Sequence, residues 1–324
     1  MSPRSHPEGS TPAPAIAMTY EPVIGLEIHA ELKTRTKMFC GSLNDPNETR
    51  PNVNVCPVCM GHPGTLPVIN QSAVEKVIRV GLALSGAIAP HTHFERKNYF
   101  YPDLPKGYQI SQYARPLSSG GWLEVTNAAG ETTRIRIRRV HLEEDTGRSI
   151  HDPKTKTTLL DFNRAGIPRM ERVTEPDLTD AGEARLAAEE LQRIFQYVGA
   201  SDANMEKGEM RIEANVSVRP AGSADLGTKV ELKNINSFRF VEDAIRFEIE
   251  RQSGLLERGE NIAQETRGWD AQKGATVPQR LKEESHDYRY FPEPDLPPLR
   301  VERAWMEELR ASLPELPAAK RYRF

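Results

Sequence analysis

The chain has 324 residues, 38% of them hydrophobic and 27% charged, which describes an ordinary soluble globular protein with room for two domains. Its 25 prolines and 22 glycines indicate many turns and argue against a helical bundle. The net charge of -3 gives no global basic signal for nucleic-acid binding, although it is compatible with a local basic surface.

Cysteine content and hydropathy indicate where the protein works. Three cysteines, an odd number at low density, argue against a disulfide framework and favour a reducing cytosol. No segment is long and apolar enough to span a membrane, and the N-terminus lacks a signal-peptide pattern. We therefore expect a cytoplasmic protein without a membrane partner.

The N-terminal part begins with a tail and continues into a strand. Residues 1–19 are rich in Pro, Ser and Ala, which predicts a disordered tail and a fold that starts near Tyr20. Residues 22–32 alternate apolar and polar side chains, which predicts a half-buried strand. Its polar face carries Glu27 and His29, which can share a metal ion or can simply be an exposed strand face.

A cysteine knuckle follows in a loop rich in Asn, Pro and Gly. Cys40 precedes the pair Cys56 and Cys59, and this spacing resembles most of a structural zinc site. A closed zinc site needs four ligands. Ser42 stands where a fourth thiol is expected, and His62 is the available substitute.

The next two segments differ in kind. Residues 71–85 have apolar side chains at helical spacing, which predicts a core helix. Residues 94–113 show no clean period, and prolines at 102 and 105 exclude a continuous helix, which is typical of a functional loop. The basic and aromatic residues of this loop can hold a phosphate and stack a base, or can anchor a structural loop: Arg96, Lys97, Lys106, Tyr99, Phe100 and Tyr101.

Residues 122–125 and 134–142 read as a hairpin that runs into three carboxylates, Glu143, Glu144 and Asp145. Adjacent like charges cost free energy unless a cation neutralises them, although a solvated turn is the alternative. Residues 158–163 predict another strand, followed by a Gly–Pro turn flanked by Arg164 and Arg169.

The C-terminal half repeats the same pattern. Residues 180–198 predict a helix with a capping box from Asp180 and Glu183. Residues 211–219 and 229–233 alternate strictly, which places Glu213 and Glu231 on polar strand faces. Ser237 then predicts the N-cap of a helix whose N-terminus can receive an anion. Residues 282–297 cannot form a regular helix, and residues 302–312 predict a short one.

Five side chains are expected to converge on one side of an antiparallel sheet: Glu27, His29, Glu144, Glu213 and Glu231. Several carboxylates and one imidazole suit Mg²⁺ or Mn²⁺ better than zinc. With nearby Lys and Arg, they form the usual apparatus for handling nucleoside triphosphates. Because no P-loop, kinase or dinucleotide signature appears, the residues alone indicate a Mg²⁺-dependent enzyme of unknown substrate.

Read as whole motifs, these segments resemble the B-subunit family of the aspartyl/glutamyl-tRNA amidotransferases. The matching stretches occur in family order between residues 20 and 298: IGLEIHAELKT, RKNYFYPDLPKGYQISQY, HLEEDTG, DFNRAGIP, TEPDL, GTKVELKNINSF and DYRYFPEPDLPP. The resemblance implies an α+β fold, a glutamine-synthetase-like cradle of antiparallel β-sheet flanked by helices, over residues 20–298. It also implies that residues 299–324 start a helical domain, with the rest of that domain and a tRNA-binding tail domain absent.

The resemblance further implies a ligase reaction that uses ATP and Mg²⁺. The family phosphorylates the side-chain carboxylate of misacylated Glu-tRNA(Gln) or Asp-tRNA(Asn), and ammonia then displaces the phosphate. An amidase A subunit supplies the ammonia from glutamine, and a small C subunit completes a heterotrimer. The alternatives are an inactive scaffold that binds tRNA or a partner, and a free-standing Mg²⁺-dependent ligase or phosphatase acting on a small carboxylate.

Residue roles carried over from the family are expectations. The Mg²⁺ ligands are expected to be Glu27, His29, Glu144 and Glu231. Glu213 stands where the family tends to have Asp, and we expect it to act catalytically with Glu144 and Lys233, in the second shell or on a second metal. The expected contacts to phosphate or to the tRNA acceptor end are Lys233, Asn234, Ser237, Arg164 and Arg289. A zinc ion on Cys40, Cys56 and Cys59 is in doubt because the family's CxC half reads Cys40-Gly-Ser42 here.

Overall fold

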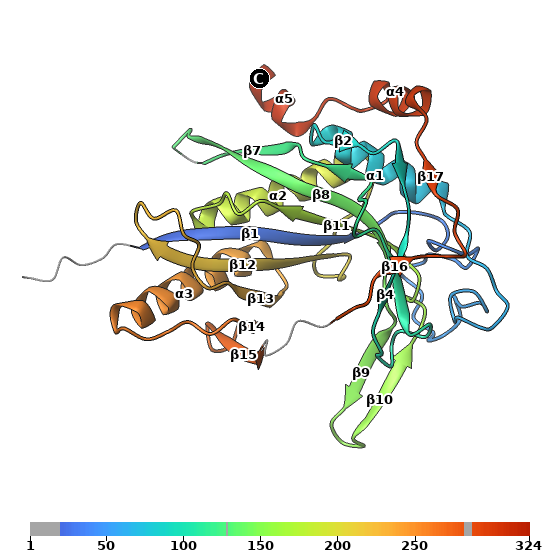
Figure 1. The fold of residues 1–324 in the computed structure, drawn as a ribbon, viewed down its shortest axis with the longest axis horizontal. Coiled ribbons are helices and arrows are strands. Elements are labelled where there is room, and N and C mark those ends of the chain that lie inside the picture. The colour runs from blue at the N-terminus through green and yellow to red at the C-terminus, as the bar shows by residue number, and fades with distance from the viewer. Residues whose placement is uncertain (1–19, 128, 282–286) are drawn as a thin grey trace, which may run out of the picture.

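One ten-stranded sheet organises the residues that the computed structural model describes, namely 20–127, 129–281 and 287–324 (Figure 1). In spatial order its strands are β15 (Ala275–Leu281), β14 (Glu265–Asp270), β13 (Val230–Ile235), β12 (Met210–Pro220), β1 (Tyr20–Glu31), β11 (Pro168–Thr174), β8 (Thr132–Glu144), β6 (Ser118–Ser119) and β2 (Ala87–Ile88), with β7 (Trp122–Thr126) paired to β8. Neighbours are antiparallel except β13 and β14. The expected tail, residues 1–19, lies outside the described residues.

Three helices cover one face of this sheet: α1 (Gln71–Ala83), α2 (Ala181–Tyr197) and α3 (Phe238–Glu257) (Figure 1). Because strand side chains alternate between faces, β1 sends Ile24, Leu26 and Ile28 into the core, and each is at most 1% exposed. The expected α+β fold with a mostly antiparallel sheet is confirmed. The sheet is therefore apolar on its helical face and polar on its open face.

The predicted helix starts are confirmed by their caps. Asp180 accepts a hydrogen bond from the Glu183 N–H at 3.0 Å, and Ser237 accepts one from the Phe240 N–H at 3.2 Å. The second half of the predicted capping box has a different partner, because the Glu183 carboxylate accepts from the Thr133 hydroxyl. The predicted helix at residues 71–85 corresponds to α1.

The prediction of an irregular loop at residues 94–113 is wrong at both ends of the segment. β4 (Glu95–Asn98) and β5 (Tyr108–Ser111) pair in antiparallel fashion, and β16 (Phe291–Pro292) pairs with β4. The sequence did not predict these strands because their polar side chains form hydrogen bonds and ion pairs with residues that are distant in the chain. Arg96, for example, binds the buried Glu293 carboxylate through Nε and Nη2 at 2.8 Å each.

The remaining elements lie at the edges. β9 (Arg148–Asp152) and β10 (Thr157–Asp161) form a hairpin that projects from the body (Figure 1), and β3 (His91–Thr92) pairs with β17 (Leu299–Arg300). α4 (Arg303–Ala311), which corresponds to the helix predicted at 302–312, contacts α1, and α5 (Pro317–Arg323) contacts α2. No helix in the described part of the chain combines the length and apolarity needed to cross a membrane.

Arg172 breaks the apolar pattern of the helical face. It stands opposite Ile28 in the β1–β11 register and is fully buried. Within the described ranges, none of its three guanidinium nitrogens has a hydrogen-bond partner. Burial lowers the pKa of its guanidinium to about 9, so the group is still charged at neutral pH. An unpaired charge in an apolar core destabilises the folded state.

Replacing Arg172 with methionine should therefore stabilise the protein. We expect Arg172→Met to raise the free energy of unfolding by at least about 1 kcal/mol at pH 7, measured by urea denaturation, because an apolar side chain of similar length removes the buried charge. The gain should shrink above the folded pKa of about 9, since the native arginine then loses its proton. Arg138→Met is the control, because exposed Arg138 pairs only at the surface with Glu175. A lower stability for Arg172→Met would show that its charge has a favourable role.

Candidate active site

Charged side chains collect on the open face, where five central strands present them. The register places Glu27 of β1 opposite Glu213 of β12, and His29 between Arg211 of β12 and Glu171 of β11. On β13, Glu231 and Lys233 share a face at a spacing of two residues. The alternation that buries the apolar side chains of β1 thus brings these charges together.

The first cluster consists of Glu27, His29 and Glu213, whose ligand atoms lie within 4.8 Å of one another. His29 Nε2 is 3.1 Å from Glu27 Oε1, and the Lys233 ammonium donates to Glu213 Oε2 at 2.7 Å. Burial raises the pKa of Glu27, but the hydrogen bond and charge of His29, with the charge of Lys233, outweigh it and lower the pKa to about 2. Two carboxylates and one imidazole form a donor set that fits Mg²⁺ or Mn²⁺.

Glu231 lies beside this cluster. Its Oε1 is 3.6 Å from the Lys233 ammonium, and its Oε2 accepts from the Thr266 hydroxyl at 2.8 Å. The structure thus brings together four of the five side chains expected to converge.

The second cluster lies on the other side of the imidazole and comprises His29, Glu143 and Glu171. His29 Nδ1 is 3.3 Å from Glu143 Oε1. Burial and Arg169 lower the pKa of His29, but Glu143 and Glu27 more than offset them and raise it to about 9. The imidazole therefore lies between two carboxylates, with one nitrogen toward each.

Arg169 and Arg164 neutralise the carboxylates at the end of β8. Arg169 donates to Glu143 Oε1 through Nε at 2.7 Å and to Asp145 Oδ1 through Nη1 at 3.0 Å, and Arg164 also donates to Asp145. The intervening turn passes through Gly166, whose φ of 87° favours glycine and whose N–H donates to the Asp145 carbonyl. The turn thus brings both predicted arginines to the carboxylate run.

Glu144 is not part of this face. Strand alternation turns it the same way as Val140 and Leu142, and its carboxylate accepts from Lys106 and from the Ile110 N–H at 2.9 Å. The expected convergence of Glu144 with Glu27 is therefore wrong, and Glu143 lies there instead. The available signal was the alternation from Val140 and Leu142, which a run of three carboxylates obscures.

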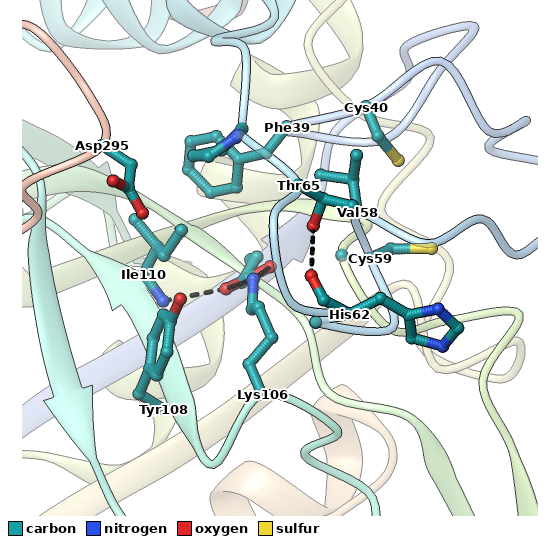
Figure 2. A pocket seen from close by; sticks show the side chains of 14 residues that line it. Phe39, Cys40, Val58, Cys59, His62, Thr65, Lys106, Tyr108, Ile110 and Asp295 are labelled. Carbon is teal, nitrogen blue, oxygen red and sulfur yellow. Dashed lines mark hydrogen bonds and ion pairs between the residues drawn. The ribbon is translucent and has the colours of Figure 1, made fainter.

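The Lys106–Glu144 pair borders a cavity of 60 Å³ next to the cysteine knuckle (Figure 2). Cys40, Cys56 and Cys59 have their sulfurs within 4.8 Å of one another, a group that does not include His62. Instead, Ser42 Oγ is 3.9 Å and Lys37 Nζ is 3.7 Å from Cys59 Sγ. The group thus offers three thiol ligands, one fewer than a closed zinc site needs.

Glu31 marks the other end of the face, where a cavity of 560 Å³ is lined by charged and amide side chains. Arg164 is 3.0 Å from Glu31 Oε1. Burial raises the pKa of Glu31 to about 7 with help from Asp145, although Arg164 opposes the change. This cavity has the size of a small-molecule site, with a more charged lining than most such sites have.

Five tyrosines form a series of ring contacts that includes Tyr99 and Tyr290 near Glu143, and we call them the aromatic rim. Ring centroids of successive members lie 4.7 to 6.1 Å apart along the series Tyr101, Tyr99, Tyr288, Tyr290 and Tyr113. Burial, with Glu143 and Glu171, raises the pKa of the Tyr290 hydroxyl, which places this ring beside the charges. Tyr113, with Arg139 over its ring, is 53% exposed and stacks on Tyr290.

Residues 22–307 match the family described as the GatB/GatE catalytic domain. The chain belongs to this family. Proteins named as the B subunit of aspartyl/glutamyl-tRNA(Asn/Gln) amidotransferase, from Thermodesulfovibrio yellowstonii, Caldanaerobacter subterraneus and Persephonella marina, are 55%, 54% and 53% identical to the chain over 307 residues. Each alignment covers 95% of this chain, which spans 64% of the length of these curated relatives. The family expected from the motifs is thereby confirmed.

The residues expected to contact phosphate or the tRNA acceptor end lie in different parts of this GatB/GatE catalytic domain. Lys233 and Arg164 lie on the charged face, as described above. Asn234, with a φ of 61°, donates to the Trp269 carbonyl, and the Ser237 hydroxyl caps α3. Arg289 is 82% exposed and lies 3.5 Å from Asp287. The polar groups of Asn234 and Ser237 thus stabilise the fold, and their expected ligand contacts stay predictions.

Removing the cation of the Lys106–Glu144 pair should destabilise the domain strongly. Glu144 is 2% exposed, so Lys106→Met leaves a buried carboxylate without its counter-charge, and we expect a loss of about 3–5 kcal/mol in the free energy of unfolding. The double variant Lys106→Met/Glu144→Leu should recover most of it, as measured in a double-mutant cycle by urea denaturation. Lys33→Met, at an exposed pair with Asp202, is the control and should change the free energy of unfolding far less, because solvent screens the pair. Equal losses for both lysines would contradict a buried pair.

Proposed function

We propose that the chain is the catalytic domain of the B subunit of a tRNA-dependent amidotransferase. It amidates misacylated Glu-tRNA(Gln) and/or Asp-tRNA(Asn), with ATP and Mg²⁺, through an acyl phosphate. The observation that carries the proposal is the cluster of Glu27, His29 and Glu213 beside Lys233 on the open sheet face. The family and the names of its relatives support the substrate class.

Glu27, His29 Nε2 and Glu213 are the residues that would hold Mg²⁺, which supplies positive charge to a nucleoside triphosphate. Lys233 has a third of its side chain exposed, so its ammonium can exchange Glu213 for a phosphate oxygen. Arg164 lies in the wall of the cavity of 560 Å³, and we propose that it exchanges Glu31 for a substrate carboxylate, which it binds and orients.

The chemistry follows from the weakness of a carboxylate as an electrophile. Its oxygen attacks the terminal phosphorus of ATP, which forms the acyl phosphate and releases ADP. Ammonia then attacks the carbonyl carbon, and inorganic phosphate leaves with the bonding electron pair. We propose that an amidase A subunit supplies the ammonia from glutamine and that a small C subunit completes a cytoplasmic heterotrimer.

Two further roles belong to this proposal. The three thiols would hold zinc as a structural ion, with a fourth ligand from outside the group. The aromatic rim, with Arg139 over Tyr113 and Lys97 over Tyr288, would stack a nucleobase from ATP or from the tRNA acceptor end. The domain division at residues 20–298 and 299–324 stays a prediction.

Loss of a metal-binding carboxylate should abolish amidation. With the A and C subunits, ATP, Mg²⁺, glutamine and misacylated tRNA, we expect Glu27→Gln to lower amide formation by at least about 100-fold while the fold is kept. Glu124→Gln is the control, because Glu124 pairs with Arg134 away from the cluster. If the wild-type chain binds tRNA but forms no acyl phosphate, the hypothesis of an inactive scaffold that binds tRNA would be favoured. Rapid ATP turnover on a small carboxylate without the other subunits would favour the free-standing ligase.

Removal of an exposed ring should weaken nucleobase binding. We expect Tyr113→Ala to raise the KM for ATP or for tRNA by about 5- to 100-fold with little change in kcat, because one base stack is lost. Whichever of the two KM values rises identifies the source of the base. Tyr322→Ala removes a ring that is 74% exposed on α5 and should change neither value. Unchanged KM values for both substrates in Tyr113→Ala would show that the aromatic rim is not part of the binding site.

A further inference from the structure

His29 contributes one nitrogen to each of two possible cation positions. Its Nε2 faces Glu27, with Glu213 beside it, and its Nδ1 faces Glu143, with Glu171 beside it. The imidazole is 8% exposed, so neither nitrogen is free to turn toward bulk water. From donor atoms alone, the face offers sites for two divalent ions.

The Glu143 side already contains a permanent cation. Arg169 contacts Glu143 Oε1 with Nε at 2.7 Å and Nη2 at 2.6 Å, and it contacts Asp145 Oδ1 with Nη1 at 3.0 Å. The side chains of Glu143 and Asp145 are 3% and 1% exposed, so solvent screens this contact poorly. A guanidinium keeps its charge at any physiological pH. A divalent ion on Glu143 would compete with the two contacts from Arg169 to Glu143 Oε1 and be repelled by the charge of Arg169.

The cation position on the Nε2 side of His29, next to Glu213, is different. The cation there is Lys233, whose flexible side chain is 33% exposed and makes one short contact to Glu213. An ammonium of this kind can move aside when a metal ion binds, whereas the buried fork of Arg169 cannot. The two sides of His29 therefore differ in what an incoming ion must displace.

We propose that Arg169 is a built-in cation in place of a second metal, so that the face binds one divalent ion, on Glu27, His29 Nε2 and Glu213. Arg169 also acts as a positioning residue. It fixes Glu143 with Oε1 3.3 Å from His29 Nδ1, so that the Nδ1 side of the imidazole faces this carboxylate and the Nε2 side faces the ion. Metal-bound histidines commonly have such a carboxylate partner on the other nitrogen. This inference rests on the metal site of the proposed function and adds its stoichiometry and its support.

Mn²⁺ binding to the chain tests the inference without any turnover. Calorimetric titration and electron paramagnetic resonance should give one Mn²⁺ per wild-type chain, with one coordinated imidazole nitrogen. Arg169→Leu frees the carboxylate of Glu143, while Asp145 keeps its contact with Arg164. This variant should gain a second Mn²⁺ site with spin coupling between the ions, whereas Arg169→Lys should keep one. Arg138→Leu, which removes an exposed charge from β8, should bind one ion with unchanged affinity.

Glu143→Gln tests the positioning role if Arg169→Leu fails to fold. We expect it to keep one site with about 10- to 100-fold weaker Mn²⁺ affinity, as for other outer partners of metal-bound histidines, whereas Glu27→Gln should lose the site. Two ions on the wild-type chain, or one ion with unchanged affinity in both Arg169→Leu and Glu143→Gln, would overturn the inference and leave the proposed function standing. No Mn²⁺ binding by a folded wild-type chain would overturn both.

Discussion

The structure depends on the alternation of side chains along β1. Because one set of alternate residues must be apolar to pack into the core, the other set faces the open side of the sheet, where β1 carries Glu27, His29 and Glu31. The neighbouring strands obey the same rule, so their charged residues gather on that face as well. The same alternation therefore both buries the core and brings the charged residues together.

Gathered carboxylates repel one another, and the sheet balances them with its own cations. His29 lies between Glu27 and Glu143, Arg169 joins Glu143 to Asp145, and Lys233 contacts Glu213. Arg169 and Lys233 lie on strands next to those of Glu143 and Glu213, whereas His29 contacts Glu143 across β11. This balance lets the face fold before any metal or nucleotide binds, and it leaves anionic oxygens in place for an incoming cation.

Much of the fold follows from local sequence, because caps, periodicity and alternation are local properties. Asp180 and Ser237 were predicted as caps from their own neighbours, and β1, β12 and β13 from alternation. The misses arise where partners are distant. Arg96 pairs with Glu293 and Lys106 with Glu144, so neither cation is free for a phosphate as the sequence suggested. In the run Glu143, Glu144 and Asp145, composition cannot tell which carboxylate faces which way, and only the phase set by Val140 and Leu142 can.

The two cations beside His29 differ in exposure and mobility, and the proposed phosphoryl transfer would use this difference. A group that must follow a phosphate from ATP to an acyl phosphate needs freedom to move, and the partly exposed Lys233 has it. A group that must hold the imidazole in one orientation needs the opposite, and buried Arg169 with its fork of contacts supplies it. If position 233 held an arginine and position 169 a lysine, a rigid guanidinium would compete with the proposed metal ion. A mobile ammonium would then leave the His29 imidazole unsupported. A lysine on one strand and an arginine on another thus suit the proposed reaction, and both lie within the same alternating pattern that builds the core.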